Sequence, residues 1–147
     1  MELIPVQATL EENPEFVNHP DCQESISMTI DFYKVVGFNP PWIGYYANQD
    51  GRLVGCGAFK GQPVDGKVEI AYGTFEALRT QGIGTEICRQ LVMLSMKANA
   101  AVRITARTLP EENHSTKILR KNGFDLLGIV FDKDDGDVWE WEYRPNL

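Results

Sequence analysis

Two glycines, Gly82 and Gly84, stand one residue apart in the stretch EALRTQGIGTEIC, three and five residues after Arg79. Strand-forming residues precede this stretch, and the residues after it have helical spacing. A glycine-rich turn that opens a helix presents unpaired backbone N–H groups at the positive end of the helix dipole, and glycine has no Cβ to block an approaching anion. The pattern favours an anion-binding turn, while a plain tight turn between a strand and a helix remains the alternative.

Two common phosphate-binding motifs do not fit this turn. The dinucleotide-binding pattern G-x-G-x-x-G needs a third glycine, and Ile87 stands in its place. The P-loop needs a Gly-Lys-Ser/Thr sequence, which does not follow. The elements around the glycines therefore have to decide what the turn binds.

Those elements are predicted from hydrophobic periodicity and turn residues. We expect strands, helices and hairpins in the order strand, helices, three strands, helix, strand, helix and two strands. The helix over 23–36 ends at Gly37, and the helix after the glycines carries Ile87, Leu91, Leu94 and Ala98 on one face. The stretch DKDDGD lacks the glutamate of a calcium loop and is predicted to be a hairpin turn.

Size and composition limit the possible classes of protein. A chain of 147 residues, 43% of them hydrophobic, predicts a single domain over 1–147. The net charge of -7 argues against nucleic acid and suits a cationic acceptor. Three cysteines without metal-site spacing predict free thiols and no metal. The chain also lacks a secretory signal pattern and an apolar run of about 20 residues, so we expect a cytoplasmic protein that does not bind membranes.

The combination of EIAYGTF, RTQGIGTE and NHSTKILRKNGF resembles the GNAT superfamily of acetyl-CoA-dependent N-acetyltransferases. The resemblance covers about the last three quarters of the chain. The residues in these three motifs are most similar to those of the branch that includes the ribosomal-protein N-terminal acetyltransferases. It implies an α+β fold with a mixed, mostly antiparallel sheet of about six to seven strands, in which the fourth and fifth strands splay apart. It also implies acetyl-CoA as the acyl donor and an amine, possibly a protein N-terminus, as the acceptor. A monomer or a homodimer would both fit.

In that family the cofactor pyrophosphate lies on the glycine-containing loop and the pantetheine arm lies along the fourth strand. The resemblance implies the following cofactor-binding residues: Tyr72, Gly73, Thr74, Arg79, Thr80, Gln81, Gly82, Ile83, Gly84, Thr85, Asn113 and Ser115.

The reaction that the resemblance implies is direct attack of a neutral amine on a thioester. It requires a proton acceptor, and Glu69 is the candidate because strand alternation places it on the same face as Ala71 and Gly73. A solvated glutamate without a catalytic role is the alternative. Acting through water, as some family members do, would help a carboxylate that is a weak base for an alkylammonium.

The sequence departs from the family pattern at two places. Leu119 stands where many members have a tyrosine that donates a proton to the thiolate, and Glu112 stands where the cofactor asparagine most often lies, one place before Asn113. The missing tyrosine keeps a second hypothesis open, a module that binds acetyl-CoA without turnover. His114 is expected to be a solvated or capping residue rather than a catalytic one.

Overall fold

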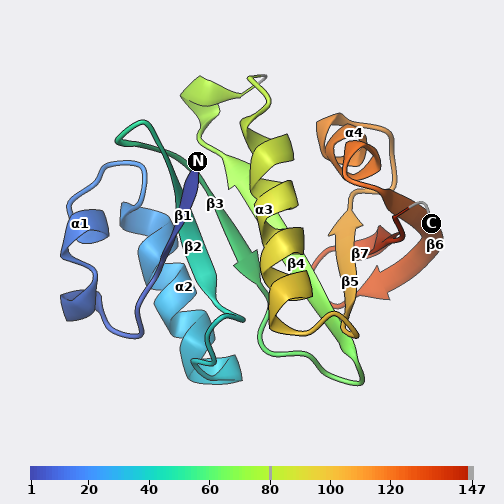
Figure 1. Ribbon diagram of the computed structural model, residues 1–147, viewed down its shortest axis with the longest axis horizontal. Coiled ribbons are helices and arrows are strands. Elements are labelled where there is room, and N and C mark those ends of the chain that lie inside the picture. Colours follow the sequence, from blue (N-terminus) through green and yellow to red (C-terminus); the bar gives the residue numbers. More distant parts are fainter. Residues whose placement is uncertain (80, 146–147) are drawn as a thin grey trace.

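The computed structural model describes residues 1–79 and 81–145, and Figure 1 shows one twisted sheet with helices packed against it. The predicted order of elements is confirmed. In chain order they are β1 (Glu2–Pro5), η1 (Leu10–Glu12), α1 (Pro14–Val17), α2 (Gln23–Val36), β2 (Gly44–Gln49), β3 (Arg52–Phe59), β4 (Lys67–Thr74), η2 (Glu76–Leu78), α3 (Ile83–Ala98), β5 (Arg103–Thr108), α4 (His114–Lys121), β6 (Phe124–Asp132) and β7 (Gly136–Tyr143).

The predicted hairpins form where the turn residues allow them. Asp50 and Gly51 have φ of 55° and 82° and join β2 to β3, since two left-handed residues match the twist of a two-residue hairpin. Between β6 and β7, Asp132 Oδ1 accepts hydrogen bonds from the backbone N–H groups of Asp134 and Asp135. DKDDGD is therefore a hairpin turn held by an aspartate side chain, as predicted.

Helices α2 and α3 cover opposite faces of the sheet. A Cβ on Gly44 would lie 3.0 Å from Thr29 of α2, whereas a Cβ on Gly57 would lie 2.7 Å from Ile87 of α3. Gly44 pairs with Ala58, the neighbour of Gly57 on β3, and neighbouring strand residues point to opposite faces. In Figure 1 α3 crosses in front of the sheet.

The buried faces of these helices are mostly those that the sequence predicts. Ile26, Ile30 and Tyr33 of α2 are buried. On α3, Ile87 and Leu91 are buried and Leu94 is partly buried, but the prediction for Ala98 was wrong because α3 is exposed from Met96 to its end. No helix in the described part of the chain is long and apolar enough to cross a membrane.

The sheet has the strand order β1-β2-β3-β4-β5-β7-β6. Among the strand pairs of the described residues, β4 and β5 are the one parallel pair, and their pairing stops at Ile70 and Ala106. On its other side, β4 stays paired with β3 as far as Thr74. The strands therefore splay beyond Ile70, and within residues 1–79 and 81–145 no strand pairs with the β5-facing edge of β4 from Ala71 to Thr74. This confirms the predicted mixed, mostly antiparallel α+β fold.

Candidate active site

The open edge of β4 presents two backbone amides to the gap. The N–H of Phe75 donates to the carbonyl of Val54 on β3, so the backbone groups of alternate residues, Thr74 and Tyr72, point the other way, toward β5. A Cβ on Gly73 would meet no atom within 4 Å. An extended ligand can therefore lie along β4 and bond to it as an added strand would.

A cavity of about 370 Å³ opens at this edge, between β4 and the first turns of α3 and α4. It brings together seven of the predicted cofactor residues from three segments that are far apart in the sequence. It is lined by Tyr72, Gly73, Thr74, Arg79, Gly84, Asn113, His114, Ser115 and Ile118. We call it the β4-edge cavity. His114 and Ile118 are lining residues that the prediction left out.

The start of α3 gives the two glycines different roles. Gly82 precedes the helix with a left-handed φ of 77° and open space around it. Gly84 is buried in the first turn, where a Cβ would lie 2.8 Å from Ile118 of α4. Gly84 thus allows α3 and α4 to approach closely, in addition to lining the cavity.

Other residues of the predicted loop do not line the β4-edge cavity. Ile83 is 6% exposed in the core, so only its backbone can face a ligand. Gln81 is exposed, and Thr85 accepts a hydrogen bond from Asn122 through its carbonyl group. Thr80 lies outside the described residues. The prediction that these loop residues bind the cofactor stays a prediction.

The start of α4 is fixed by a capping box. Asn113 Oδ1 accepts a hydrogen bond from the Thr116 N–H at 3.0 Å, and Thr116 Oγ1 accepts one from the Asn113 N–H at 3.0 Å. Asn113 therefore has a structural role as well as a place in the cavity wall. Leu119, which stands in place of the family tyrosine, is fully buried in the core.

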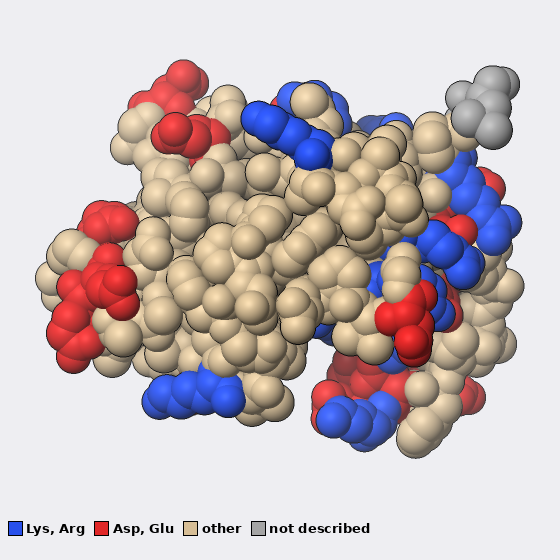
Figure 2. All heavy atoms as spheres, turned by 60° about the horizontal axis from the view of Figure 1, so that its bottom comes forward, with Lys and Arg blue, Asp and Glu red and all other residues tan. Residues whose placement is uncertain are grey.

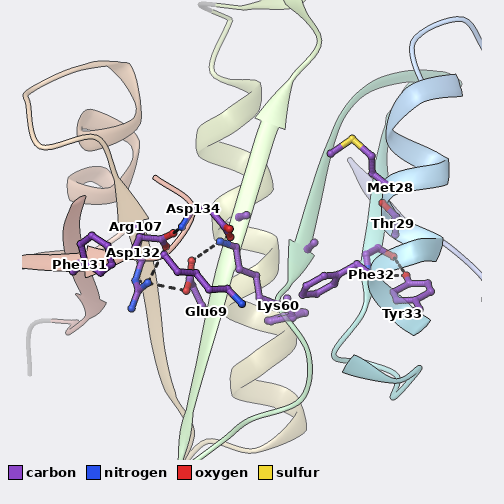
Figure 3. Close-up of a pocket in the computed structure, with 15 residues that line it drawn as sticks. Met28, Thr29, Phe32, Tyr33, Lys60, Glu69, Arg107, Phe131, Asp132 and Asp134 are labelled. Carbon is purple, nitrogen blue, oxygen red and sulfur yellow. Dashed lines mark hydrogen bonds and ion pairs between the residues drawn. The ribbon is translucent and has the colours of Figure 1, made fainter. Parts of the chain in front are cut away.

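A cavity of about 700 Å³ lies on the other face of the sheet, between α2 and the strands β3, β4 and β5. We call it the α2-side cavity. Figure 3 shows Met28, Phe32 and Tyr33 of α2 on one side and the charged residues Lys60, Glu69, Arg107, Asp132 and Asp134 on the other. The wall formed by α2 is therefore mostly apolar, and the opposite wall is charged.

Glu69 lies in this cavity, on the face that strand alternation predicts. Its Oε2 is 2.7 Å from Lys60 Nζ, and its Oε1 is 3.8 Å from Arg107 Nε. Arg107 also lies 2.9 Å from Asp132 Oδ2 through Nη1 and 3.9 Å from Glu140 Oε1 through Nη2. Backbone N–H groups and Arg107 hold the pKa of Asp132 below its usual value. Arg107 of β5 thus links β4, β6 and β7 through ion pairs in the wall of the cavity.

The two cavities approach each other at β4. A smaller cavity of about 230 Å³ shares Thr29, Gly44, Ala58 and Ala71 with the α2-side cavity. It shares Tyr72 and Gly73 with the β4-edge cavity. Groups bound on the two faces of the sheet can therefore meet beside Ala71 to Gly73.

Sequence reasoning missed Lys60 and Arg107. The hairpin register places Lys60 opposite Glu69, since the Lys60 N–H donates to the Glu69 carbonyl. The parallel register with β5 places Thr105 beside Glu69 and therefore puts Arg107 on the same face. The alternation of side chains along β3, continued to Lys60, and along β5 identifies both residues once the register of these strands with β4 is known.

Comparison with known proteins identifies the family. A model of the GNAT acetyltransferase domain matches residues 3–125. The chain belongs to the GNAT acetyltransferase family. The prediction of an acyltransferase of this family is confirmed. No curated protein sequence matches the chain.

Solved GNAT structures have the same fold at low sequence identity. RimL, a ribosomal L7/L12 alpha-N-protein acetyltransferase in complex with coenzyme A, has a TM-score of 0.67 and 16% identity over 98% of both chains. A ribosomal-protein-alanine N-acetyltransferase from Brucella melitensis has a TM-score of 0.61 and 18% identity, over 89% of this chain and 88% of that chain.

The microcin C7 self-immunity acetyltransferase MccE, in complex with acetyl-CoA and AMP, has a TM-score of 0.64 and 17% identity. The match covers 88% of this chain and 74% of that chain. The neighbours thus include the expected branch of the GNAT family and an acetyltransferase with a different name. The fold alone leaves the acceptor open.

Proposed function

We propose that this GNAT protein transfers the acetyl group of acetyl-CoA to a primary amine by direct attack within a ternary complex. The observation that carries the proposal is the meeting of two cavities at the open edge of β4. One cavity offers backbone donors and a helix start, and the other offers a carboxylate. Each thus suits one of the two reactants.

The β4-edge cavity suits the acyl donor. The pantetheine arm is an extended amide chain, which can bond to the free backbone groups of Tyr72 and Thr74. The pyrophosphate is an anion, for which Arg79 and the first amides of α3 are suitable partners. The same open amides can stabilise the oxyanion that forms when the amine attacks the thioester carbon.

The α2-side cavity suits the acceptor amine, and Glu69 is the proposed proton acceptor. The amine must lose a proton to attack, and Glu69 is positioned to collect it directly or through a water molecule. In the attack a C–N bond forms and the C–S bond breaks, so that coenzyme A leaves as a thiolate. A thiol with a pKa of about 8.5 can leave as a thiolate without a proton donor. The reaction therefore does not require the helix tyrosine that many family members have.

A protein N-terminus and a small-molecule amine are both within this proposal. Figure 2 shows basic side chains in small separate groups on the face turned toward the viewer. The net charge of -7 acts over the whole surface and does not decide between the two.

The test is a thiol-release assay with acetyl-CoA and a panel of primary amines, amino acids and N-terminal peptides. We expect thiol release that depends on both substrates, together with an acetylated product identified by mass spectrometry. Tight binding of acetyl-CoA with no release for any acceptor would overturn the proposal and favour a binding module instead.

A further inference from the structure

The charged wall of the α2-side cavity is balanced rather than acidic. Its charged lining residues are three bases and three acids: Lys60, Arg107, Lys133, Glu69, Asp132 and Asp134. The whole chain has a net charge of -7, so this balance differs from the average of the protein. A polyamine would find no excess of acidic groups here. An acceptor whose own charges cancel is better matched to this wall.

The Lys60–Glu69 pair places one positive and one negative group side by side at the edge of this wall. Lys60 Nζ and Glu69 Oε2 are 2.7 Å apart, and their side chains are 46% and 21% exposed. An ion pair with this exposure contributes only about 0–1 kcal/mol, since water competes for both groups. A ligand that carries an ammonium and a carboxylate can therefore open the pair at little cost and replace one ion pair by two.

The charged wall also has hydrogen-bonding capacity left over. Arg107 Nε is buried and makes no hydrogen bond within the described part of the chain. Its contact with Glu69 Oε1 is an ion pair at 3.8 Å, which is too long for a hydrogen bond. This donor is buried within the wall, so it is a feature of the charged wall itself and not a contact for the ligand.

The opposite wall is apolar and open to solvent. Met28 and Phe32 of α2 are 65% and 40% exposed, and they lie one helical turn apart. Figure 3 shows both side chains across the cavity from Glu69 and Lys60. Exposed apolar side chains that line a cavity gain stability when a ligand covers them.

We propose that the acceptor is a free amino acid with an apolar side chain, acetylated on its α-amine. In this arrangement Glu69 binds the ammonium, Lys60 binds the carboxylate, and the side chain packs against Met28 and Phe32. The inference rests on the proposed function and names its acceptor class. A peptide N-terminus is the less favoured acceptor, because it lacks a carboxylate on the residue that carries the amine.

The reaction then balances with no further reactant. The α-ammonium gives one proton to Glu69, the neutral nitrogen forms the bond to the acetyl carbon, and the C–S bond breaks; the nitrogen loses its second proton to the departing thiolate, and Glu69 returns its proton to solvent. The products are an N-acetyl amino acid and coenzyme A. Acetylation removes the positive charge that Glu69 binds, so the product loses one of the two ionic contacts of the substrate. The product therefore binds more weakly than the substrate and is released.

The experiment compares kcat/KM for leucine and phenylalanine with that for their decarboxylated amines and for peptides that begin with the same residues. Thiol release is measured with the parent enzyme, Lys60→Met and Lys60→Arg, with Lys97→Met on the exposed end of α3 as the matched control. For each enzyme we take the ratio of kcat/KM for the amino acid to kcat/KM for its decarboxylated amine. Comparing this ratio between enzymes removes the effect of the different pKa values of the two amines. Folding of each variant is checked by its melting temperature.

We expect Lys60→Met to lower this ratio about threefold to fivefold, as the loss of one partly exposed ion pair would, through a higher KM for the amino acid, while Lys60→Arg and Lys97→Met keep it near the parent value. Phe32→Ser should lower the ratio of leucine to glycine in the same assay. If amines or peptides react as well as amino acids with the parent enzyme, the acceptor class is wrong, although the acetyltransferase activity stands. A ratio that does not respond to Lys60→Met overturns the role of Lys60. If none of the acceptors gives thiol release, the proposed function itself is contradicted.

Discussion

At the scale of single residues, Glu69 lies between two cationic side chains. Lys60 contacts one carboxylate oxygen and Arg107 lies beyond the other. This arrangement keeps the carboxylate in the cavity and limits the directions from which an amine can approach it. The position of Glu69 was predicted from strand alternation, but its partners depend on β3 and β5.

We predict that Glu69→Gln lowers the acetylation rate about 10²-fold or more at neutral pH, because removing a positioned base has effects of about 10²- to 10⁴-fold. The affinity for acetyl-CoA should stay near the parent value. The loss should shrink at high pH, where the amine is already neutral in solution and the base contributes less. Steady-state rates from about pH 6 to 10 and a binding titration test this. A loss that is the same at every pH would indicate a structural role.

At the scale of elements, the first turn of α3 performs two tasks with two glycines. Gly82 turns the chain into the helix, and Gly84 lets α3 pack against α4. The sequence motif suggests one shared purpose, the approach of an anion. The structure separates the two residues, because only Gly84 has an atom of α4 where its Cβ would lie.

We predict that Gly84→Val lowers the melting temperature more than Gly82→Ala does. Valine at position 84 would force Ile118 to move, and overpacking of this kind costs about 1–3 kcal/mol. Alanine at position 82 meets open space and adds only the cost of a left-handed φ, about 1 kcal/mol. Thermal melting of both variants, with and without acetyl-CoA, separates stability from binding. Equal stability of the two variants would contradict this packing role.

Strand β7 carries a buried acid that ties the last strands together. Glu142 is 6% exposed and pairs with Arg103 of β5, and it also contacts Arg144 at 3.2 Å. Burial opposes its ionisation, but Arg103 and Arg144 outweigh burial and hold the pKa of Glu142 below its usual value. Because the pKa of Glu142 is lower in the folded state, its ionised carboxylate stabilises the fold at pH values above the unfolded pKa, near 4.5. This stabilisation is lost as the pH falls through the folded-state pKa.

We predict that Glu142→Gln lowers the free energy of unfolding by about 1 kcal/mol at pH 7, a modest amount because both arginines are about half exposed. The difference from the parent should narrow below about pH 4.5, where the parent also loses its carboxylate charge. Urea unfolding at a series of pH values measures both effects. Glu24→Gln, at an exposed position of α2, is the control and should change little. A difference that persists at low pH would assign the effect to packing.

At the scale of the whole molecule, the splay of β4 and β5 couples cofactor binding to the stability of the fold. A ligand in the β4-edge cavity would contact β4, α3 and α4 together, because residues of all three elements line it. A ligand that binds only the folded state stabilises it according to its excess over the dissociation constant.

We predict that acetyl-CoA raises the melting temperature as the logarithm of its concentration. The stabilisation is about 2.7 kcal/mol at a hundredfold excess over the dissociation constant, which corresponds to about 5–10 °C for a chain of this size. Differential scanning fluorimetry measures it, with adenosine as a control that lacks both the pyrophosphate and the pantetheine arm. An unchanged melting temperature at millimolar acetyl-CoA would contradict the assignment of the β4-edge cavity.

The sequence by itself determined the elements and the family. Period-two and period-3.6 hydrophobic patterns, with turn residues such as Asp50, Gly51 and Gly123, act over short distances along the chain and predicted every strand and the longer helices. The motifs around Gly82 and Gly84 indicated the GNAT family before any contact was known.

Only the tertiary structure decided what these residues contact. Strand register places Lys60 and Arg107 beside Glu69, and the packing of α4 on α3 gives Gly84 its second role. The balanced charge of the charged wall of the α2-side cavity likewise depends on β3, β4, β5 and the β6–β7 turn coming together. Such contacts join residues far apart in the chain, and periodicity carries no information about which strands pair or where a pair ends.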